Sequence, residues 1–158
     1  MSATHGTGYT QYATFEVAGH YLGIRVLEVQ EVLRRQQLTP VPLAPPVIAG
    51  LINVRGEIIP ALEMRRLLRL AERDDPQDAL SVVLQTETGA VSLQVDEIGD
   101  VVEIEDRRLE AAPLNLAPYI KTCLSGVCQM KERLLLVLDT GRTVDVSAAY
   151  LHGGSEAS

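Results

Sequence analysis

The polar residues best placed for chemistry lie between Gly50 and Pro60, in the sequence Gly-Leu-Ile-Asn-Val-Arg-Gly-Glu-Ile-Ile-Pro. Two apolar runs, typical of strands, flank a polar turn that presents Asn53, Arg55 and Gly56. An arginine guanidinium carries five N–H donors in a fixed fork, and an asparagine amide both donates and accepts hydrogen bonds. Groups of this kind form hydrogen bonds with carboxylates and with backbone carbonyls.

The same residues also have structural explanations. Gly56 fits a turn position that needs a positive φ angle. Pro60 has no amide donor, so it limits the pairing of the second apolar run. We therefore assign Gly50, Gly56 and Pro60 to shaping the turn and its strands. For Asn53 and Arg55, hydrogen bonds within the turn and a solvated charge remain the alternative to partner contact.

Residues typical of catalysis or metal binding form no recognisable group. There is no Gly-x-Ser-x-Gly and no Gly-rich phosphate loop. Asp96 and Glu97 are adjacent, and a solvated turn is the simpler interpretation. Cys123 and Cys128 are expected to be buried free thiols, because a metal site needs more ligands and the three histidines are scattered. We predict a protein that is not an enzyme and holds no metal or cofactor.

Composition narrows the class of partner. The chain has 158 residues, of which 46% are hydrophobic and 22% charged, so it can bury a core as one domain or two small lobes. With one Phe and no Trp, that core must be aliphatic. A net charge of -7 argues against nucleic acid and against an anionic membrane surface. We see no signal peptide and no apolar run of membrane-spanning length, so the cytosol is the expected compartment.

Hydrophobic periodicity predicts short strands joined in hairpins, with few helices. Four prolines between Leu38 and Pro46 predict an extended loop. Short helices are expected from Val26 to Leu33, from Met64 to Leu70, and from the end of the last strand to about Tyr150. The expected strands are Tyr12–Val17, Tyr21–Val26, Gly50–Val54, Glu57–Leu62, Leu80–Gln85, Ala90–Val95, Val101–Ile104, Cys123–Met130 and Leu134–Asp139.

The two halves of the sequence resemble each other. The segment Ile24–Val32 aligns without gaps on Leu93–Val101, and Gly50–Glu63 aligns on Gly126–Asp139, at offsets of 69 and 76 residues. An internal repeat of this kind predicts two related β-lobes over a shared core. We expect a first lobe at about 11–70, a linker at 71–79, a second lobe at about 80–148, and flexible ends at 1–10 and 149–158. Exchange of strands between the lobes is left open.

Six motifs occur in the order found in the CheW-like adaptor family, and the sequence resembles that family over residues 11–148. The Asn-x-Arg-Gly unit and the order of the motifs are specific to the family, whereas most of the motifs are weak evidence when taken singly. Glu63 departs from the family, in which aspartate is usual at that position. The motifs are Val29-Gln30-Glu31-Val32, the Pro-rich loop Thr39–Pro46, Gly50–Pro60, Val95–Ile98, Gly126-Val127 and Leu134–Asp139.

The resemblance implies a mainly β fold of two small five-stranded SH3-like barrels packed over a common aliphatic core, with short helices. It implies a protein that binds proteins and catalyses nothing. The implied partners are the regulatory domain of a CheA-type histidine kinase and the cytoplasmic tip of a methyl-accepting chemoreceptor, in receptor arrays near the inner membrane. Val29, Glu31, Asn53 and Arg55 are the implied receptor contacts. A CheW-like adaptor of a pilus, gliding or other chemosensory-like pathway is the alternative.

Overall fold

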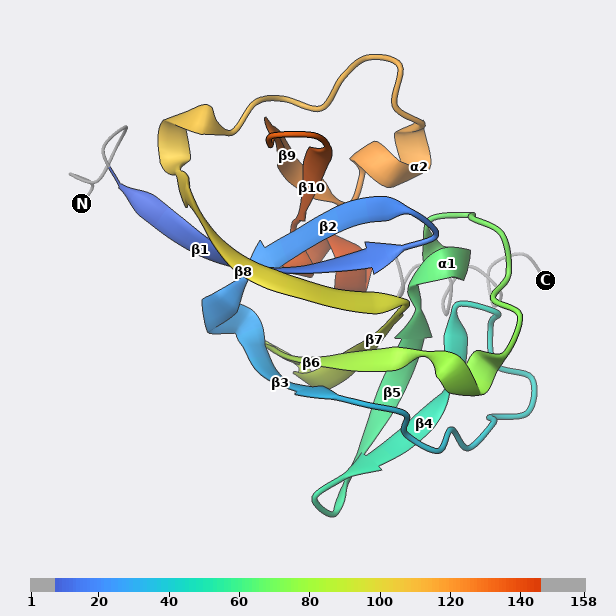
Figure 1. The fold of residues 1–158 in the computed structure, drawn as a ribbon. Coiled ribbons are helices and arrows are strands. Elements are labelled where there is room, and N and C mark those ends of the chain that lie inside the picture. The colour runs from blue at the N-terminus through green and yellow to red at the C-terminus, as the bar shows by residue number, and fades with distance from the viewer. Residues whose placement is uncertain (1–7, 146–158) are drawn as a thin grey trace.

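The computed structural model describes residues 8–145 and is mainly β. Its ten strands form two five-stranded sheets, seen one above the other in Figure 1. Sheet A has the order β8-β1-β2-β10-β9, and sheet B has the order β3-β6-β7-β5-β4. This confirms the predicted fold class. Sheet A contains β1 (Tyr9–Val17), β2 (His20–Arg25), β8 (Glu97–Glu105), β9 (Leu124–Gln129) and β10 (Leu134–Leu138); sheet B contains β3 (Val29–Leu33), β4 (Ile48–Val54), β5 (Glu57–Glu63), β6 (Leu80–Thr86) and β7 (Gly89–Val95).

The chain crosses between the sheets twice. The first crossing is the 3-10 turn η1 (Val26–Glu28), between β2 and β3, and the second is Asp96, between β7 and β8. Each sequence repeat therefore gives two strands to one sheet and three to the other. The segment 71–79, which was expected to link the two lobes, joins β5 to β6, and both strands belong to sheet B. The boundary between the two halves of the sequence is therefore not the boundary between the two sheets.

Each sheet closes into a barrel through one short backbone bridge. In sheet B, Thr39 exchanges two hydrogen bonds of 2.8 Å with Leu51, which joins the chain leaving β3 to the opposite edge strand, β4. In sheet A, Glu110 exchanges two hydrogen bonds of 2.8 Å with Val127 of β9. Leu51 and Val127 are equivalent positions of the internal repeat. The two lobes are therefore closed in the same way.

Buried side chains fill three regions. One small cluster lies inside sheet B and includes Ile52 and Ile59, and a second lies inside sheet A and includes Ile104 and Leu135. The largest cluster draws on both sheets and on the short helix α1 (Met64–Leu67). It is the aliphatic core that the two lobes share. Its largest fully buried members are Phe15, Leu22, Ile24, Met64, Leu67, Leu68, Leu84 and Leu93.

The helix predicted from Val26 to Leu33 is wrong. Only η1 is helical, and Val29–Leu33 is strand β3, paired with β6. Burial alternates along β3, but its half-buried middle position is occupied by Glu31 and the next, exposed position by Val32, so the apolar residues do not alternate as they do in a recognisable strand. The segment 1–10, expected to be flexible, is partly ordered, since Tyr9 and Thr10 belong to β1.

The remaining helices are short. The described part of the chain includes α1, α2 (Pro118–Lys121), η2 (Pro76–Asp78) and η3 (Asp106–Arg108). Residues 140–145 are also helical, and the rest of the helix predicted to reach about Tyr150 lies outside the described residues. The tail expected at 149–158 also lies outside them. Cys123 and Cys128 are buried and free, as predicted.

Gly50 and Gly126 stand next to the two closing bridges, which explains why both repeats have glycine there. A Cβ atom at Gly50 would lie 2.8 Å from the Thr39 carbonyl oxygen, and Gly50 has a φ of 156°. A Cβ atom at Gly126 would lie 3.0 Å from the Glu110 carbonyl oxygen. In both lobes the bridge brings the two backbones so close that an added Cβ atom would require the neighbouring chain to shift.

We predict that Gly50→Ala lowers the free energy of unfolding by about 2 kcal/mol, because it adds both a backbone clash and conformational strain. Gly126→Ala is the matched variant and should cost less, since its contact is longer and its φ is not in the left-handed region. Denaturant unfolding of both variants measures the difference. If both substitutions lowered the free energy of unfolding equally, the backbone approach at Gly50 would not be closer than that at Gly126.

Candidate functional site

The β4–β5 hairpin ends in a tight turn that projects away from the rest of sheet B in Figure 1. Arg55 and Gly56 form a two-residue connection, with φ angles of 55° and 88°. Positive φ at both central residues is typical of a type I′ hairpin turn. The Gly56 N–H donates a 2.9 Å hydrogen bond to Oδ1 of Asn53, which fixes the turn from the preceding strand.

Arg55 is an unfavourable residue for its backbone conformation. The first central position of a type I′ turn favours Asn, Asp or Gly, because a bulky side chain is strained at positive φ. Its side chain is 80% exposed, so burial does not explain its presence. Residues that break a local rule in this way are often kept for function.

Arg55 reaches across the barrel to strand β3. One guanidinium nitrogen, Nη2, lies 3.0 Å from Oε1 of Glu31, whose side chain is only 16% exposed. The ion pair therefore links the hairpin tip to the opposite edge of the sheet. An exposed pair of this kind contributes at most about 1 kcal/mol to stability. In this structure it places the Arg55 guanidinium beside Glu31.

The structure brings together three of the four predicted receptor contacts. Glu31, Asn53 and Arg55 form one group, which we call the hairpin site. Val29 lies two residues before Glu31 on β3, but it is half-buried and packs against the shared core. Pro60 lies on β5 opposite Leu51, just before the parallel pairing of β5 with β7 begins at Ala61.

A shallow groove borders the hairpin site. It has a volume of about 560 Å³ and is lined by Asn53 and its cross-strand neighbour Ile58, together with Leu51 and the chain that leaves β3. Ile58 is 58% exposed. A polar turn beside exposed apolar side chains is the arrangement that an amphipathic helix or another protein surface would contact.

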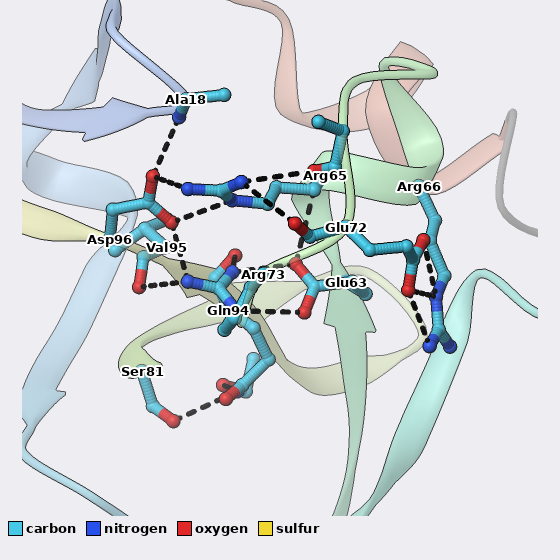
Figure 2. Close-up of polar contacts among 12 residues, drawn as sticks. Ala18, Glu63, Arg65, Arg66, Glu72, Arg73, Ser81, Gln94, Val95 and Asp96 are labelled. Atoms are coloured by element: carbon cyan, nitrogen blue, oxygen red, sulfur yellow. Dashed lines mark hydrogen bonds and ion pairs between the residues drawn. The ribbon is translucent and has the colours of Figure 1, made fainter. Parts of the chain in front are cut away.

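A second polar group, the interlobe ion cluster, consists of Glu63, Arg65, Arg73 and Asp96 (Figure 2). Arg65 donates to both carboxylate oxygens of Asp96, at 3.1 and 2.7 Å. Arg73 donates to both oxygens of Glu63, at 3.2 and 2.7 Å, and also bonds Asp96. The two arginines thus clamp the residue at which the chain crosses between the sheets.

The cluster joins both lobes. The backbone N–H of Ala18, in the β1–β2 turn of sheet A, donates a 2.6 Å hydrogen bond to Oδ2 of Asp96. Burial alone would raise the pKa of Asp96, but the bonds from Arg65 and Ala18 and the charge of Arg73 outweigh it and hold the pKa below its usual value. Asp96 is therefore kept ionised by groups from three separate segments.

The sequence interpretation missed this cluster. Asp96 was assigned to a solvated turn and Arg73 to a charged linker, but their side chains are only 17% and 7% exposed. That assignment is wrong for Asp96, because the crossing point lies against α1 and not in solvent. Hydrophobic periodicity cannot show whether a single arginine in a loop is buried. The available signal in the sequence was the Val95–Ile98 motif, which contains Asp96.

Comparison with known proteins places the chain in a family. Residues 11–147 match the CheW-like domain, so the chain belongs to the CheW-like domain family. It is 28% identical to the chemotaxis protein CheW of Bacillus subtilis over 145 residues, which cover 92% of each chain. It is 26% identical to CheW of Treponema pallidum over 133 residues, 82% of this chain and 78% of that one.

Two further matches differ in kind. The scaffolding protein TtCheW from Thermoanaerobacter tengcongensis aligns with a TM-score of 0.75 at 22% identity, covering 85% of this chain and 87% of that one, which supports the fold. Protein FrzA of Myxococcus xanthus is 38% identical over 73 residues, 46% of each chain. These relatives are named as chemotaxis or scaffolding proteins or by a gene-derived name, and none is named as an enzyme. No helix within residues 8–145 is long and apolar enough to cross a bilayer.

We predict that Arg73→Met lowers the free energy of unfolding by about 3 kcal/mol, because it leaves the buried carboxylate of Glu63 without a cationic partner and removes one of the two arginines that contact Asp96. The matched variant Arg55→Met should change it by less than about 1 kcal/mol, since that ion pair is exposed. Urea unfolding followed by circular dichroism measures both. Similar small losses in the two variants would show that the cluster does not stabilise the fold.

The lowered pKa of Asp96 predicts how stability depends on pH. A carboxylate with a folded pKa below its unfolded value stabilises the fold above about pH 4 and loses that contribution as the pH falls through the folded pKa. The melting temperature of Asp96→Asn should therefore lie furthest below that of the unmodified protein at neutral pH. The gap should narrow in acid. A gap that stays constant with pH would contradict the assignment.

Proposed function

We propose that this chain is a non-catalytic adaptor that couples the cytoplasmic tip of a chemoreceptor to a CheA-type histidine kinase. The observation that carries the proposal is the hairpin site, where an exposed arginine is kept in a strained turn and aimed by a carboxylate. Membership of the CheW-like family supports it. The proposed location is the cytoplasmic face of receptor arrays near the inner membrane.

The proposed receptor contact follows from the chemistry of the hairpin site. A receptor tip is a helical hairpin, so its reader must offer apolar side chains flanked by polar groups. Ile58 is an exposed apolar residue that pairs with Asn53 across the hairpin. The Arg55 guanidinium has five N–H donors and makes one hydrogen bond to Glu31, which leaves donors for a carboxylate or for helix carbonyls.

The kinase contact is proposed at the level of the whole domain. We treat residues 11–148 as one adaptor unit, which binds the regulatory domain of the kinase while the hairpin site faces the receptor. Val29 is proposed to support β3 from the core side, since it is half-buried. Gly50, Gly56 and Pro60 are proposed to shape the turn and its strands.

A second candidate is an adaptor of a pilus, gliding or other chemosensory-like pathway. The match to Protein FrzA, a relative that is not named CheW, is the reason for keeping it: the identity there, 38%, exceeds the 28% to CheW of Bacillus subtilis, although it covers only 46% of the chain. Gene neighbourhood separates the two candidates. Receptor and flagellar genes beside this one support the first, and pilus genes support the second.

We predict that Arg55→Glu abolishes capture by a receptor cytoplasmic fragment and leaves capture by the kinase regulatory domain unchanged. The substitution removes the donor fork and places a second negative charge beside Glu31. Pull-down with both baits measures it. Lys131→Glu is the matched control, since Lys131 occupies the position of Arg55 in the second repeat and should retain both partners.

A second variant separates binding from folding. Arg55→Asn suits the type I′ turn better than arginine does, so it should leave the melting temperature unchanged or raised while receptor capture falls. If the unmodified protein captures neither bait, the pathway is wrong. If Arg55→Asn still captures the receptor fully, Arg55 is not a contact.

A further inference from the structure

The internal repeat allows the two barrels to be compared position by position. At the offset of 76 residues, Ala49 corresponds to Ser125 and Glu63 corresponds to Asp139. Leu38 and Leu109 also correspond, because each precedes the residue that makes its closing bridge. These positions surround one end of each barrel. We call this end the mouth of lobe A in the barrel formed by sheet A, and the mouth of lobe B in the barrel formed by sheet B.

In lobe B the mouth holds an arginine of the same chain. Arg73 lines this hollow of about 280 Å³ together with Leu38, Ala49 and Glu63. Its guanidinium makes the two-point contact with Glu63, and its side chain is 7% exposed. The segment that follows α1 thus supplies a guanidinium to the carboxylate of the barrel mouth.

In lobe A the equivalent mouth is larger, and no arginine within the described residues makes a two-point contact with its carboxylate, Asp139. It has a volume of about 400 Å³ and is lined by the equivalent residues Leu109, Ser125 and Asp139, together with the strand ends of sheet A. Arg25 also lines it, and its guanidinium is held by Glu28 at 2.8 Å. The second oxygen of Glu28 accepts a 2.7 Å hydrogen bond from Thr140.

Two carboxylates of the lobe A mouth have unused acceptor capacity. Asp106 accepts a hydrogen bond from Thr10 through Oδ1 alone, at 2.7 Å. Asp139 accepts the backbone N–H of Arg142 through Oδ1, at 2.9 Å, while its Oδ2 lies 3.9 Å from Nε of Arg142. Within residues 8–145, neither Oδ2 atom has a hydrogen-bond donor. Glu28 is compensated by Arg25, and Asp139 has a long ion pair with the largely exposed Arg142, so Asp106 is the lining carboxylate that leaves the mouth with a surplus of negative charge.

The surroundings agree with that surplus. Tyr12 lines the mouth and is almost fully buried. Burial, and then the charge of Asp106, raise its pKa. A cation that enters this hollow therefore meets a negative potential and a partly desolvated wall, where charge-assisted hydrogen bonds are stronger than in water.

We propose that the mouth of lobe A binds the side chain of an arginine presented by a partner protein, as the mouth of lobe B holds Arg73. A guanidinium fits because its planar fork can bond two carboxylate oxygens at once. The site is on the other sheet from the hairpin site, and the proposal does not depend on which partner that site binds.

The test is an NMR titration of the isotope-labelled protein with N-acetyl-arginine amide. The neutral isostere N-acetyl-citrulline amide is the matched probe. We expect saturable shifts of backbone amides in the mouth, at Thr10, Ser125 and residues 137–141, with the arginine probe alone. Asp139→Asn should weaken this binding about tenfold, since it removes a charge-assisted bond.

Two controls keep the test decisive. Glu103→Gln removes an exposed carboxylate that does not line the mouth and should leave the titration unchanged. Asp106→Asn is a second mouth variant and should also weaken binding. It provides an independent test if Asp139→Asn alters the fold. The proposal is overturned if the mouth amides do not shift, if citrulline shifts them equally, or if both mouth variants bind the arginine probe as the unmodified protein does.

Discussion

The fold depends on the two crossings of the chain between the sheets. Because each repeat gives strands to both barrels, neither barrel can be completed by one repeat, and the shared core forms only where the two meet. The crossing at Asp96 is held by two arginines and by the β1–β2 turn. An ionised carboxylate at that point is tolerated because its hydrogen bonds and charge partners exceed the cost of burial. The position of one lobe relative to the other is thus fixed by polar contacts as well as by packing.

Most of the fold could be predicted from local sequence. Alternating apolar residues identified both strands of each hairpin, and the repeat identified two related lobes. Strand β3 was taken for a helix because Glu31 occupies an inward position and Val32 an outward one, which hides the alternation of burial from the sequence. The division of strands between the sheets was not predictable in this way, since it rests on pairings such as Tyr9 with Glu105, which are far apart in the chain.

The candidate site was predicted in part. Asn53 and Arg55 stand in one turn, so their proximity follows from sequence alone. The pairing of Arg55 with Glu31 depends on closure of the barrel, which no local pattern reveals. The Glu63–Arg73 contact was missed for a related reason: a single buried arginine in a charged loop has the same composition as a solvated one. Only the three-dimensional structure distinguishes these two cases.

The exchange of strands also has a consequence for synthesis on the ribosome. Sheet B takes all its strands from the continuous segment 29–95, so its pairings can form before the rest of the chain emerges. The β1–β2 hairpin is made first, yet it must wait for β8, β9 and β10, the last strands to be translated. Long-range strand pairing of this kind folds slowly and leaves apolar edges exposed meanwhile. The amino-terminal hairpin is therefore the part of the nascent chain that most needs protection from aggregation.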